Sequence, residues 1–383
     1  MSRRIPSTLA ALIIAACAPD GATAPGAGPA LAEHGAASQR AVTVMSRNLY
    51  LGSGLAPVLA APTPQALFQG ASVVWATIQA SSFSVRAEAL AAEIAAADPA
   101  LVGLQEVTLY RVGAPFDPAP AQVVRYDYLE MLLHALEARG ARYRVVATVE
   151  NFDAELPAID AASRGPRDIR LTDRDVILAR ADVDVEDARS GRFAAQVALR
   201  VGGPGGAAIT IPRGWTSVLA AVEGRSFRFV NAHLETEDFR LVNEAQGAEL
   251  TSILAAEELP IVLVGDLNSA SDGSSTTSYQ SFLAAGYVDA WTQARPDSPG
   301  LTCCHAERLD NPAPALSKRI DYVLLRDPKL GAERGPFDAR WAEVVGDEVE
   351  DRTAPIPGSL LRLWPSDHAG VVATLRVPNR IAF

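Results

Sequence analysis

The stretch IVLVGDLNS, residues 261–269, decides the fold because an apolar run is followed at once by the polar residues Asp266 and Asn268. Ile261 to Gly265 form an unbroken apolar run, which predicts a strand that is buried on both faces. Side chains two apart on a strand share a face, so Asp266 and Asn268 point together if the strand continues that far. Asp and Asn also begin loops, so this stretch alone leaves both turn chemistry and a functional site open.

The composition is that of a soluble globular chain. It has 383 residues, of which 49% are hydrophobic and 21% charged, and this length allows one large domain or two. The net charge of −11 counts against a dedicated high-affinity DNA-binding protein, because Lys and Arg contacts to phosphate dominate such affinity. A local basic groove on an acidic body would still allow nucleic-acid binding.

The first 17 residues are predicted to be a lipoprotein-type export signal. Arg3 and Arg4 precede the apolar run LAALIIAA at 9–16, which is too short to span a bilayer as a mature helix. The run ends at Cys17, as in bacterial lipoprotein signals, where the cysteine is lipidated and becomes the first residue. The alternative is a secretory signal cut after Ala24. The expected location is therefore a bacterial membrane, reached through a lipid anchor, or the periplasm or medium.

A flexible tether and one folded domain are expected after the signal. Residues 18–40 are rich in Ala, Gly and Pro and predict the tether, and residues 41–383 predict the domain. Loss of residues 1–16 removes two arginines and leaves 32 basic against 45 acidic residues, a net charge of −13. Cys303 and Cys304 are neighbours, so they are expected as a vicinal disulfide or as buried thiols, with too few partners for zinc.

Strands and helices alternate along the domain. Helices are expected at 86–100, 121–140 and 241–257, and loops or insertions at 113–120, 151–173 and 326–363. Strands are expected at 41–50, 101–107, 143–150, 175–183, 193–201, 207–211, 217–235 (a hairpin), 261–265, 319–325 and 369–377. Hairpins mixed with helices predict an α/β (α+β) fold with mixed, largely antiparallel sheets covered by helices.

Six of these strands begin or end with residues that are able to carry out chemistry. The residues are Asn48, Glu106, His233, Asp266 with Asn268, Asp321, and Asp367 with His368. One polar residue at a strand end is ordinary turn chemistry. Six ends marked in the same way predict one shared functional site.

Seven segments in this order resemble the endonuclease/exonuclease/phosphatase superfamily, which includes deoxyribonuclease I-like enzymes. They are SRNLYLG (46–52), GLQEV (103–107), DRDVILAR (173–180), VNAHLE (230–235), VGDLNS (264–269), RIDYVLL (319–325) and SDHAGVV (366–372). The resemblance implies a four-layer sandwich of two packed β-sheets flanked by helices. It also implies hydrolysis of phosphate esters with Mg²⁺ or Mn²⁺ as the cofactor.

The resemblance and the chemistry of each side chain together assign roles at the metal. Glu106 is a hard oxygen ligand suited to Mg²⁺. Asn48 is expected to add its carbonyl to the ion or to hold Glu106 in place. Asp367 is expected as an outer ligand or as part of a second metal position.

The remaining strand-end residues are assigned to the reaction. Asp266 orients or deprotonates the attacking water, and Asn268 donates to a phosphoryl oxygen. His233 and His368 donate to the developing charge or to the leaving oxygen. Asp321 fixes the tautomer of His368, as carboxylates often do for catalytic histidines.

Two further residues are candidates for substrate binding. Asp175 lies where family members often place a polar residue near the phosphate, and a turn at the start of a strand is the competing interpretation. Tyr50 stands where some relatives carry an Asp, so a second metal ligand from this strand is in doubt, and the tyrosine is expected to line the pocket instead. His305 is left without an assignment.

The favoured function is an exported metal-dependent phosphoesterase that acts on a phosphodiester or phosphomonoester, as an expected monomer. A secreted non-specific nuclease is the alternative within the enzyme class. A catalytically inactive surface binding lipoprotein is the alternative of another class, and the completeness of the residue set argues against it. A small or membrane-borne substrate is preferred to duplex DNA because of the acidic charge. Ile209, Ile211 and Trp215 lie near a hairpin tip and either touch lipid or pack into the core.

Overall fold

The computed structural model describes residues 41–328 and 337–378, and two mixed β-sheets form its centre. In the described residues the first sheet has the strand order β15-β16-β1-β2-β6-β3-β4, with β5 also paired to β6. Its strands are β1 (Ala41–Asn48), β2 (Leu101–Gln105), β3 (Leu109–Gly113), β4 (Val123–Asp127), β5 (Tyr143–Asp160), β6 (Gly165–Arg180), β15 (Asp338–Val345) and β16 (Gly370–Arg376).

The second sheet has the order β13-β14-β12-β11-β10-β7. Its strands are β7 (Asp184–Arg192), β10 (Gly214–Val222), β11 (Arg225–His233), β12 (Ile261–Asp266), β13 (Val288–Asp289) and β14 (Asp321–Arg326), and β8 (Val197–Val201) pairs with β9 (Ala207–Ile211) in a separate hairpin. The α-helices are α1 (Ala56–Leu59), α2 (Pro64–Ala80), α3 (Phe83–Ala97), α4 (Tyr128–Ala138), α5 (Arg240–Leu254), α6 (Ser278–Ala284) and α7 (Ala290–Ala294).

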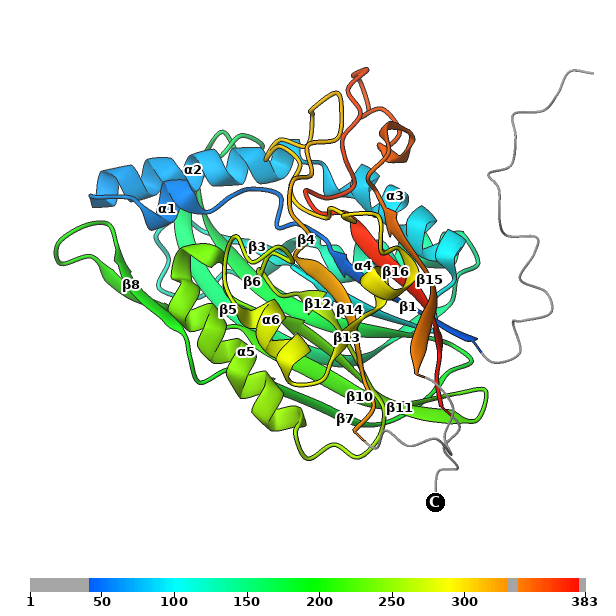
Figure 1. The fold of residues 1–383 in the computed structure, drawn as a ribbon. Helices are drawn as coiled ribbons and strands as arrows, with labels where there is room; N and C mark the ends of the chain where they lie inside the picture. The colour runs from blue at the N-terminus through cyan, green and yellow to red at the C-terminus, as the bar shows by residue number, and fades with distance from the viewer. Residues whose placement is uncertain (1–40, 329–336, 379–383) are drawn as a thin grey trace, which may run out of the picture. The chain divides into compact units, whose positions relative to one another are not determined.

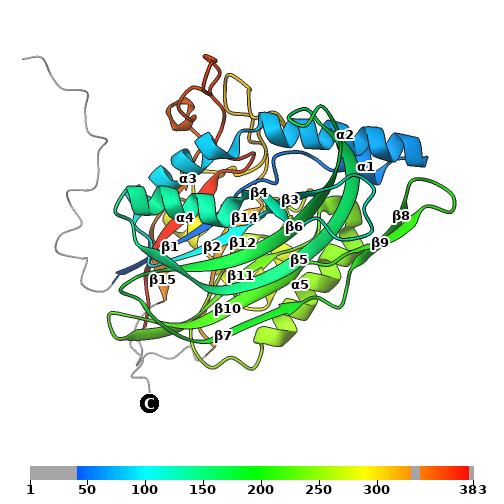
Figure 2. The same ribbon diagram turned by 180° about the vertical axis from the view of Figure 1, so that it is seen from behind.

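The apolar run at 261–265 shows how the layers form. Val262 and Val264 point into the cluster between the two sheets, whereas Ile261 and Leu263 point into the cluster beneath α5 and α6. The first sheet packs its other face against α2, α3 and α4. Helices α5 and α6 lie in front of the second sheet in Figure 1, and α3 and α4 come to the front in Figure 2. The prediction of a four-layer sandwich is confirmed.

Strand direction brings polar ends to one edge. β1 is parallel to β2, and β11 is parallel to β12, so within each pair the carboxyl ends lie side by side. His233 is the register partner of Asp266, and Asp266 is also the register partner of Asp321 on antiparallel β14. One strand end therefore stands between two others that carry functional groups.

The expected helix at 121–140 is wrong at its beginning. Val123–Asp127 form the edge strand β4, which pairs with β3, and α4 starts at Tyr128. Two β-branched residues in succession favour the strand. Asp127 then accepts a hydrogen bond from the Leu129 backbone nitrogen at 3.1 Å, which caps the helix.

The expectation of a loop at 151–173 is wrong, because β5 and β6 continue through this polar segment as a long antiparallel pair. Its residues are polar because this part of the hairpin is half-exposed, and the segment therefore carries no strand signal in the sequence. Figure 2 shows β5 and β6 running across the sheet together. The segment 326–363, expected to be loop, contains β15, which pairs with β16. β7 occupies a largely exposed sheet edge, so its charged sequence gave little strand signal.

The hairpin at 203–215 separates into two parts. Trp215 lies in β10 and packs against the cluster under α5, so for this residue the core interpretation holds. Ile209 and Ile211 belong to β9. The turn that follows its partner β8 contacts the segment after α1, where the Gly202 nitrogen donates to the Ala61 oxygen at 3.0 Å. Both isoleucines line a pocket described below.

The predicted signal, Cys17 and the tether at 18–40 lie outside the described residues. Cys303 and Cys304 are joined as a vicinal disulfide, one of the two alternatives for this pair. Within 41–328 and 337–378, helices with the length and hydropathy of a membrane span are absent.

Candidate active site

The strand ends meet around Asn48, the last residue of β1. Its side-chain Nδ2 donates to Glu106 Oε1 at 3.2 Å and to Asp266 Oδ2 at 3.1 Å, so it links the two sheets. Its Oδ1 accepts the Tyr50 backbone N–H at 2.8 Å. Of the two expected roles, this geometry supports the one in which Asn48 holds Glu106.

Three residues of the site have left-handed backbone conformations. Tyr50, Glu106 and Asn268 have φ values of 62°, 55° and 46°, each just beyond the end of a strand. Such a conformation costs a residue other than glycine about 1–3 kcal/mol and is frequent at functional sites. It turns these residues out of the alternating pattern of the strands, so their directions could not be read from a period of two.

The opening stretch forms a turn and contributes to the site. β12 ends at Asp266, so Asn268 does not share a strand face with it. Instead the Asn268 backbone nitrogen donates to Asp266 Oδ1 at 2.9 Å, and its side-chain nitrogen donates to the Leu234 oxygen at 3.0 Å. The turn therefore holds the Asp266 carboxylate in place.

His368 and Asp321 form a buried pair. His368 Nδ1 lies 2.9 Å from Asp321 Oδ2, and its Nε2 lies 3.8 Å from Asp266 Oδ2. Burial opposes a charge on the imidazole, but Asp321, Asp266 and Asp367 outweigh it and raise the pKa of His368 well above its usual value. Asp321 thus orients the ring through Nδ1, and Nε2 faces Asp266.

His233 approaches the same oxygen of Asp266 as His368 does. Its Nε2 is 3.6 Å from Asp266 Oδ2, and its Nδ1 is 3.7 Å from Asp175 Oδ1. Burial and Arg213 lower the pKa of His233, but Asp175 and Asp266 prevail and raise it above the usual value. Asp175 itself is buried inside β6, so the competing interpretation as a strand-start turn is wrong.

Sequence reasoning missed a cation next to this histidine. Arg213 Nη1 lies 3.2 Å from His233 Nδ1 and 3.8 Å from Asp173 Oδ2, and its Nη2 donates to Glu235 Oε1 at 3.4 Å. Burial and the neighbouring Asp175 raise the pKa of Asp173 to about 7. Asp173 and Glu235 stand in segments quoted for the family, which was a usable signal, whereas Arg213 precedes β10 without one.

Tyr50, which was expected to line the substrate pocket, is buried among apolar side chains. Its ring packs with Leu309, Leu363 and Trp364, and its hydroxyl donates to the Glu307 oxygen at 2.9 Å. These contacts support a structural role, and substrate binding by Tyr50 stays a prediction.

The carboxylates of the site fit a divalent cation. Burial and Asp321 raise the pKa of Asp266, and burial and Glu106 raise the pKa of Asp367 to about 7, which shows a shortage of positive charge. His233, His368 and Arg213 overcome burial and lower the pKa of Glu106, which keeps it ionised. Ionised oxygen donors are the ligands that Mg²⁺ and similar ions prefer.

Among the described residues, Asp266, Asp321 and His368 offer ligand atoms within 4.8 Å of one another, as do Cys303, Cys304 and His368. In the first set, Asp321 and His368 are already hydrogen-bonded to each other, and in the second set the two cysteines form the disulfide. Glu106 is the better candidate ligand because its oxygens are not hydrogen-bonded to a histidine. Asp367 lies near enough for the charge of Glu106 to raise its pKa.

A two-sheet sandwich with histidines, carboxylates and an amide at one edge defines a class of phosphate-ester hydrolases. Residues 77–368 match the model of the Endonuclease/Exonuclease/phosphatase family, so the chain belongs to that family. The family consists of phosphoesterases that generally depend on divalent metal ions. A comparison with curated protein sequences gave no significant match.

Solved structures share the fold. A family protein from Leptotrichia buccalis C-1013-b matches with a TM-score of 0.51 and 15% identity, over 87% of this chain and 99% of that one. The mannosyl-6-phosphatase of Bacteroides thetaiotaomicron matches with a TM-score of 0.51 and 17% identity, over 87% and 99%. D. rerio TDP2, complexed with single strand DNA product, matches with a TM-score of 0.50 and 17% identity, over 88% and 98%.

Proposed function

We propose that the chain is an exported, Mg²⁺-dependent phosphoesterase that hydrolyses a phosphodiester or phosphomonoester by in-line attack of water. The observation that carries the proposal is the placement of Asp266 between His233 and His368, with His368 paired to Asp321 at 2.9 Å. A base with a cationic donor on each side suits transfer of a phosphoryl group, in which negative charge spreads over several oxygens.

Each side chain has a proposed task in the reaction. Asp266 orients the water and takes its proton, because burial makes its carboxylate a stronger base. His368 donates from Nε2 to the phosphoryl or leaving oxygen, while Asp321 fixes its tautomer through Nδ1. His233 donates to a phosphoryl oxygen, and Asn268 supplies its amide there.

The metal has a proposed position and a proposed effect. Glu106 holds the ion, Asn48 keeps Glu106 in place, and Asp367 supports the same position. A bound divalent cation adds positive charge near the phosphoryl oxygens and the leaving group. Backbone Leu51 donates to Glu106 Oε2 at 2.7 Å, which orients the carboxylate before the ion binds.

A small or membrane-borne substrate is proposed in preference to long duplex DNA. The net charge of −11 weakens long-range attraction to a polyanion. The lipoprotein-like sequence ending at Cys17 supports export and a lipid anchor, which would keep the site near a membrane.

A non-specific nuclease is the second candidate, because D. rerio TDP2, which shares the fold, was solved with a single strand DNA product. The inactive binding lipoprotein is less well supported, because the described site keeps His233 at 3.6 Å and His368 at 3.8 Å from Asp266 Oδ2.

A substrate panel tests the proposal. Purified protein is incubated with plasmid DNA, RNA, sphingomyelin vesicles, inositol phosphates and bis-p-nitrophenyl phosphate, with Mg²⁺ or with excess chelator, in about 0.15 M salt. We expect Mg²⁺-dependent hydrolysis, with the small or vesicle-borne esters faster than DNA. Much faster cleavage of DNA would favour the nuclease, and inactivity on every ester would favour the binding protein.

A further inference from the structure

We propose that an apolar pocket beside the candidate active site binds the alcohol part of the substrate, which is therefore a phosphate ester of an apolar alcohol. This inference rests on the proposed function, because it names the substrate class of the same site. It is drawn from the position, the lining and the paired polar atoms of the pocket.

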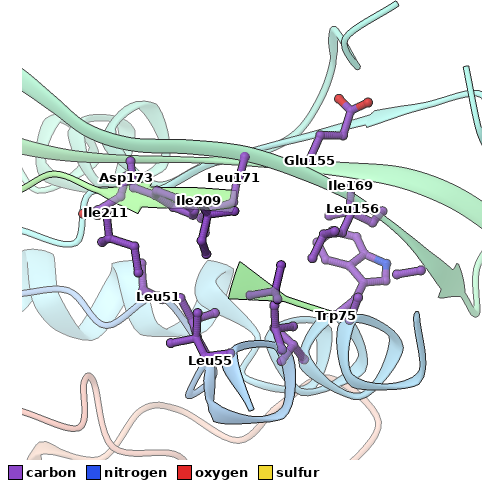
Figure 3. Close-up of a pocket in the computed structure, with 18 of the residues that line it drawn as sticks. Leu51, Leu55, Trp75, Glu155, Leu156, Ile169, Leu171, Asp173, Ile209 and Ile211 are labelled. Carbon is purple, nitrogen blue, oxygen red and sulfur yellow. The ribbon is translucent and has the colours of Figure 1, made fainter. Parts of the chain in front are cut away.

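The pocket lies between the helices α1 and α2 and the strands β5, β6 and β9, with a volume of about 210 Å³. Figure 3 shows Leu55 and Trp75 on the helical side, and Leu171 and Ile209 on the side of the strands. Of the 22 described residues that line it, Glu155, Asp173 and Arg213 are charged. A pocket of this size and character accepts a small apolar group rather than a whole drug-sized ligand.

Two residues that line the pocket also contact residues of the candidate active site. Leu51, which lines it, donates its backbone N–H to Glu106 Oε2 at 2.7 Å. Arg213, which also lines it, reaches His233 Nδ1 at 3.2 Å. A phosphate bound near Glu106 and His233 would thus place one ester group at the mouth of the pocket.

The polar atoms of the lining are distributed unevenly. Trp75 Nε1 already donates to Asp160 Oδ1 at 3.1 Å, and the Tyr110 hydroxyl already donates to the Leu51 oxygen at 2.9 Å. By contrast, buried Arg213 Nε and Asp173 Oδ1 have no hydrogen-bond partner among the described residues. Of the described lining side chains, those with unpaired buried polar atoms are therefore Arg213 and Asp173, both at the catalytic end. The Arg213 donor suits a phosphate oxygen, whereas Asp173 Oδ1 is an acceptor.

This distribution selects against a nucleotide. A base buried in the pocket would leave its donors and acceptors without partners, which is costly. A second phosphate further along would meet apolar side chains, because Arg213, the one cation among the 22 described lining residues, lies at the catalytic end. An alkyl or other hydrocarbon group meets neither obstacle and gains from leaving water.

β9 offers variants with matched controls. Ala207, Ile209 and Ile211 line the pocket. Ile209 and Ile211 are half-buried, whereas Ala208 and Thr210, which do not line it, are exposed, as the alternation of a strand requires. A charge introduced at Ile209 enters the pocket, and the same charge at Thr210 points to solvent.

The experiment measures kcat/KM for p-nitrophenyl alkyl phosphodiesters with Mg²⁺, from methyl to octyl, below their critical micelle concentrations. Water attacks phosphorus, the bond to the p-nitrophenolate oxygen breaks, and the alkyl phosphate remains. We expect kcat/KM to rise roughly fourfold for each methylene until the pocket is filled. Hydrolysis without dependence on chain length would overturn this inference and leave the proposed function standing.

Variants locate the effect. Ile209→Glu should reduce the octyl-to-methyl ratio of kcat/KM at least about tenfold, since it places a charge in the apolar pocket. Thr210→Glu should leave the ratio unchanged. Ala207→Trp, a second and independent variant, should shorten the chain length at which the rate levels off. Equal ratios in all three variants would contradict the pocket as the binding site.

Binding separates the two proposals when catalysis fails. If no ester is hydrolysed, the methyl ester included, the proposed function is wrong. The affinity for alkylphosphonates, measured by calorimetry, should still rise with chain length if the pocket binds hydrocarbon, and a flat series would overturn the inference. The p-nitrophenyl ester of thymidine 5′-phosphate is the final arm, and preference for it over the octyl ester would assign the pocket to a base.

Discussion

At the scale of single residues, the pair of His368 and Asp321 offers the sharpest test of mechanism. Their 2.9 Å contact and the raised pKa of His368 describe one functional unit. We expect His368→Ala to lower kcat by about 10²–10⁴-fold, the usual value of general acid–base catalysis, with little change in stability. Asp321→Asn should act in the same direction.

The double variant decides whether the two residues act together. Losses in kcat should be less than additive, because both changes disable the same imidazole. Steady-state kinetics of the four proteins on bis-p-nitrophenyl phosphate give the comparison. Fully additive losses would show that Asp321 does not serve His368.

His305, which had no assignment from sequence, is a buried neutral histidine. Ala315 donates its backbone N–H to Nδ1 at 3.3 Å, Nε2 lies 3.4 Å from the Gly346 oxygen, and the ring stacks on Trp364 at 3.9 Å. Burial lowers the pKa of His305 to about 4, below its usual value of 6.5. Its stabilising contribution is therefore present above pH 6.5 and is lost as the pH falls towards 4.

This titration predicts a pH-dependent stability. The free energy of unfolding should fall by up to about 3 kcal/mol between pH 6.5 and 4 on account of His305. His305→Phe retains an aromatic ring for the stack and cannot be protonated, so its unfolding should depend less on pH. Denaturant unfolding at several pH values measures this, and identical pH profiles for both proteins would refute it.

The sequence predicted the members of the site better than their contacts. Strand-end positions identified Asn48, Glu106, His233, Asp266 and His368, and the structure brings them together. The left-handed backbone of Glu106 and Asn268 has no sequence period, so their orientation could not be predicted. Arg213 was missed because its position depends on tertiary packing of β10 against β6.

At the scale of elements, Gly103 in β2 marks a close approach of the two sheets. A Cβ atom there would contact Val264 Cγ2 and lie 2.8 Å from Asn231 Oδ1, both in the second sheet. We expect Gly103→Ala to lower the free energy of unfolding by about 1–3 kcal/mol through overpacking. Thermal or denaturant unfolding measures the change.

Gly165 at the start of β6 is the matched control. A Cβ atom there has no neighbour within 4 Å, and its backbone is outside the left-handed region. Gly165→Ala should therefore change stability little. An equal loss in both variants would show that Gly103 is sensitive for a reason other than sheet contact.

Element prediction succeeded where both faces of a strand are buried and failed at sheet edges. The apolar run in β12 left no alternative to a core strand, whereas the exposed edge strands β4 and β7 carry polar or charged residues. The β5–β6 hairpin was cut short in prediction because its outer part is half-exposed. Edge position is a property of the assembled sheet, so it is not encoded locally.

At the scale of the whole molecule, the proposal of a lipid anchor concerns residues outside the described ranges. We expect the mature protein to partition with membranes when it is expressed in a bacterium, and Cys17→Ser to release it or to block its processing. Membrane fractionation with mass spectrometry of the N-terminus measures this. An unmodified N-terminus at or beyond Pro25 would contradict the anchor.

The central claim is that this chain is a divalent-metal-dependent phosphoesterase whose metal is held by Glu106. The most direct measurement is the rate of bis-p-nitrophenyl phosphate hydrolysis against Mg²⁺ concentration, for the wild type and for Glu106→Gln. We predict a saturable dependence on Mg²⁺ in the wild type, abolished by excess chelator, and a loss of orders of magnitude in the variant. Full activity of the wild type in chelator, or of Glu106→Gln in Mg²⁺, would contradict the claim.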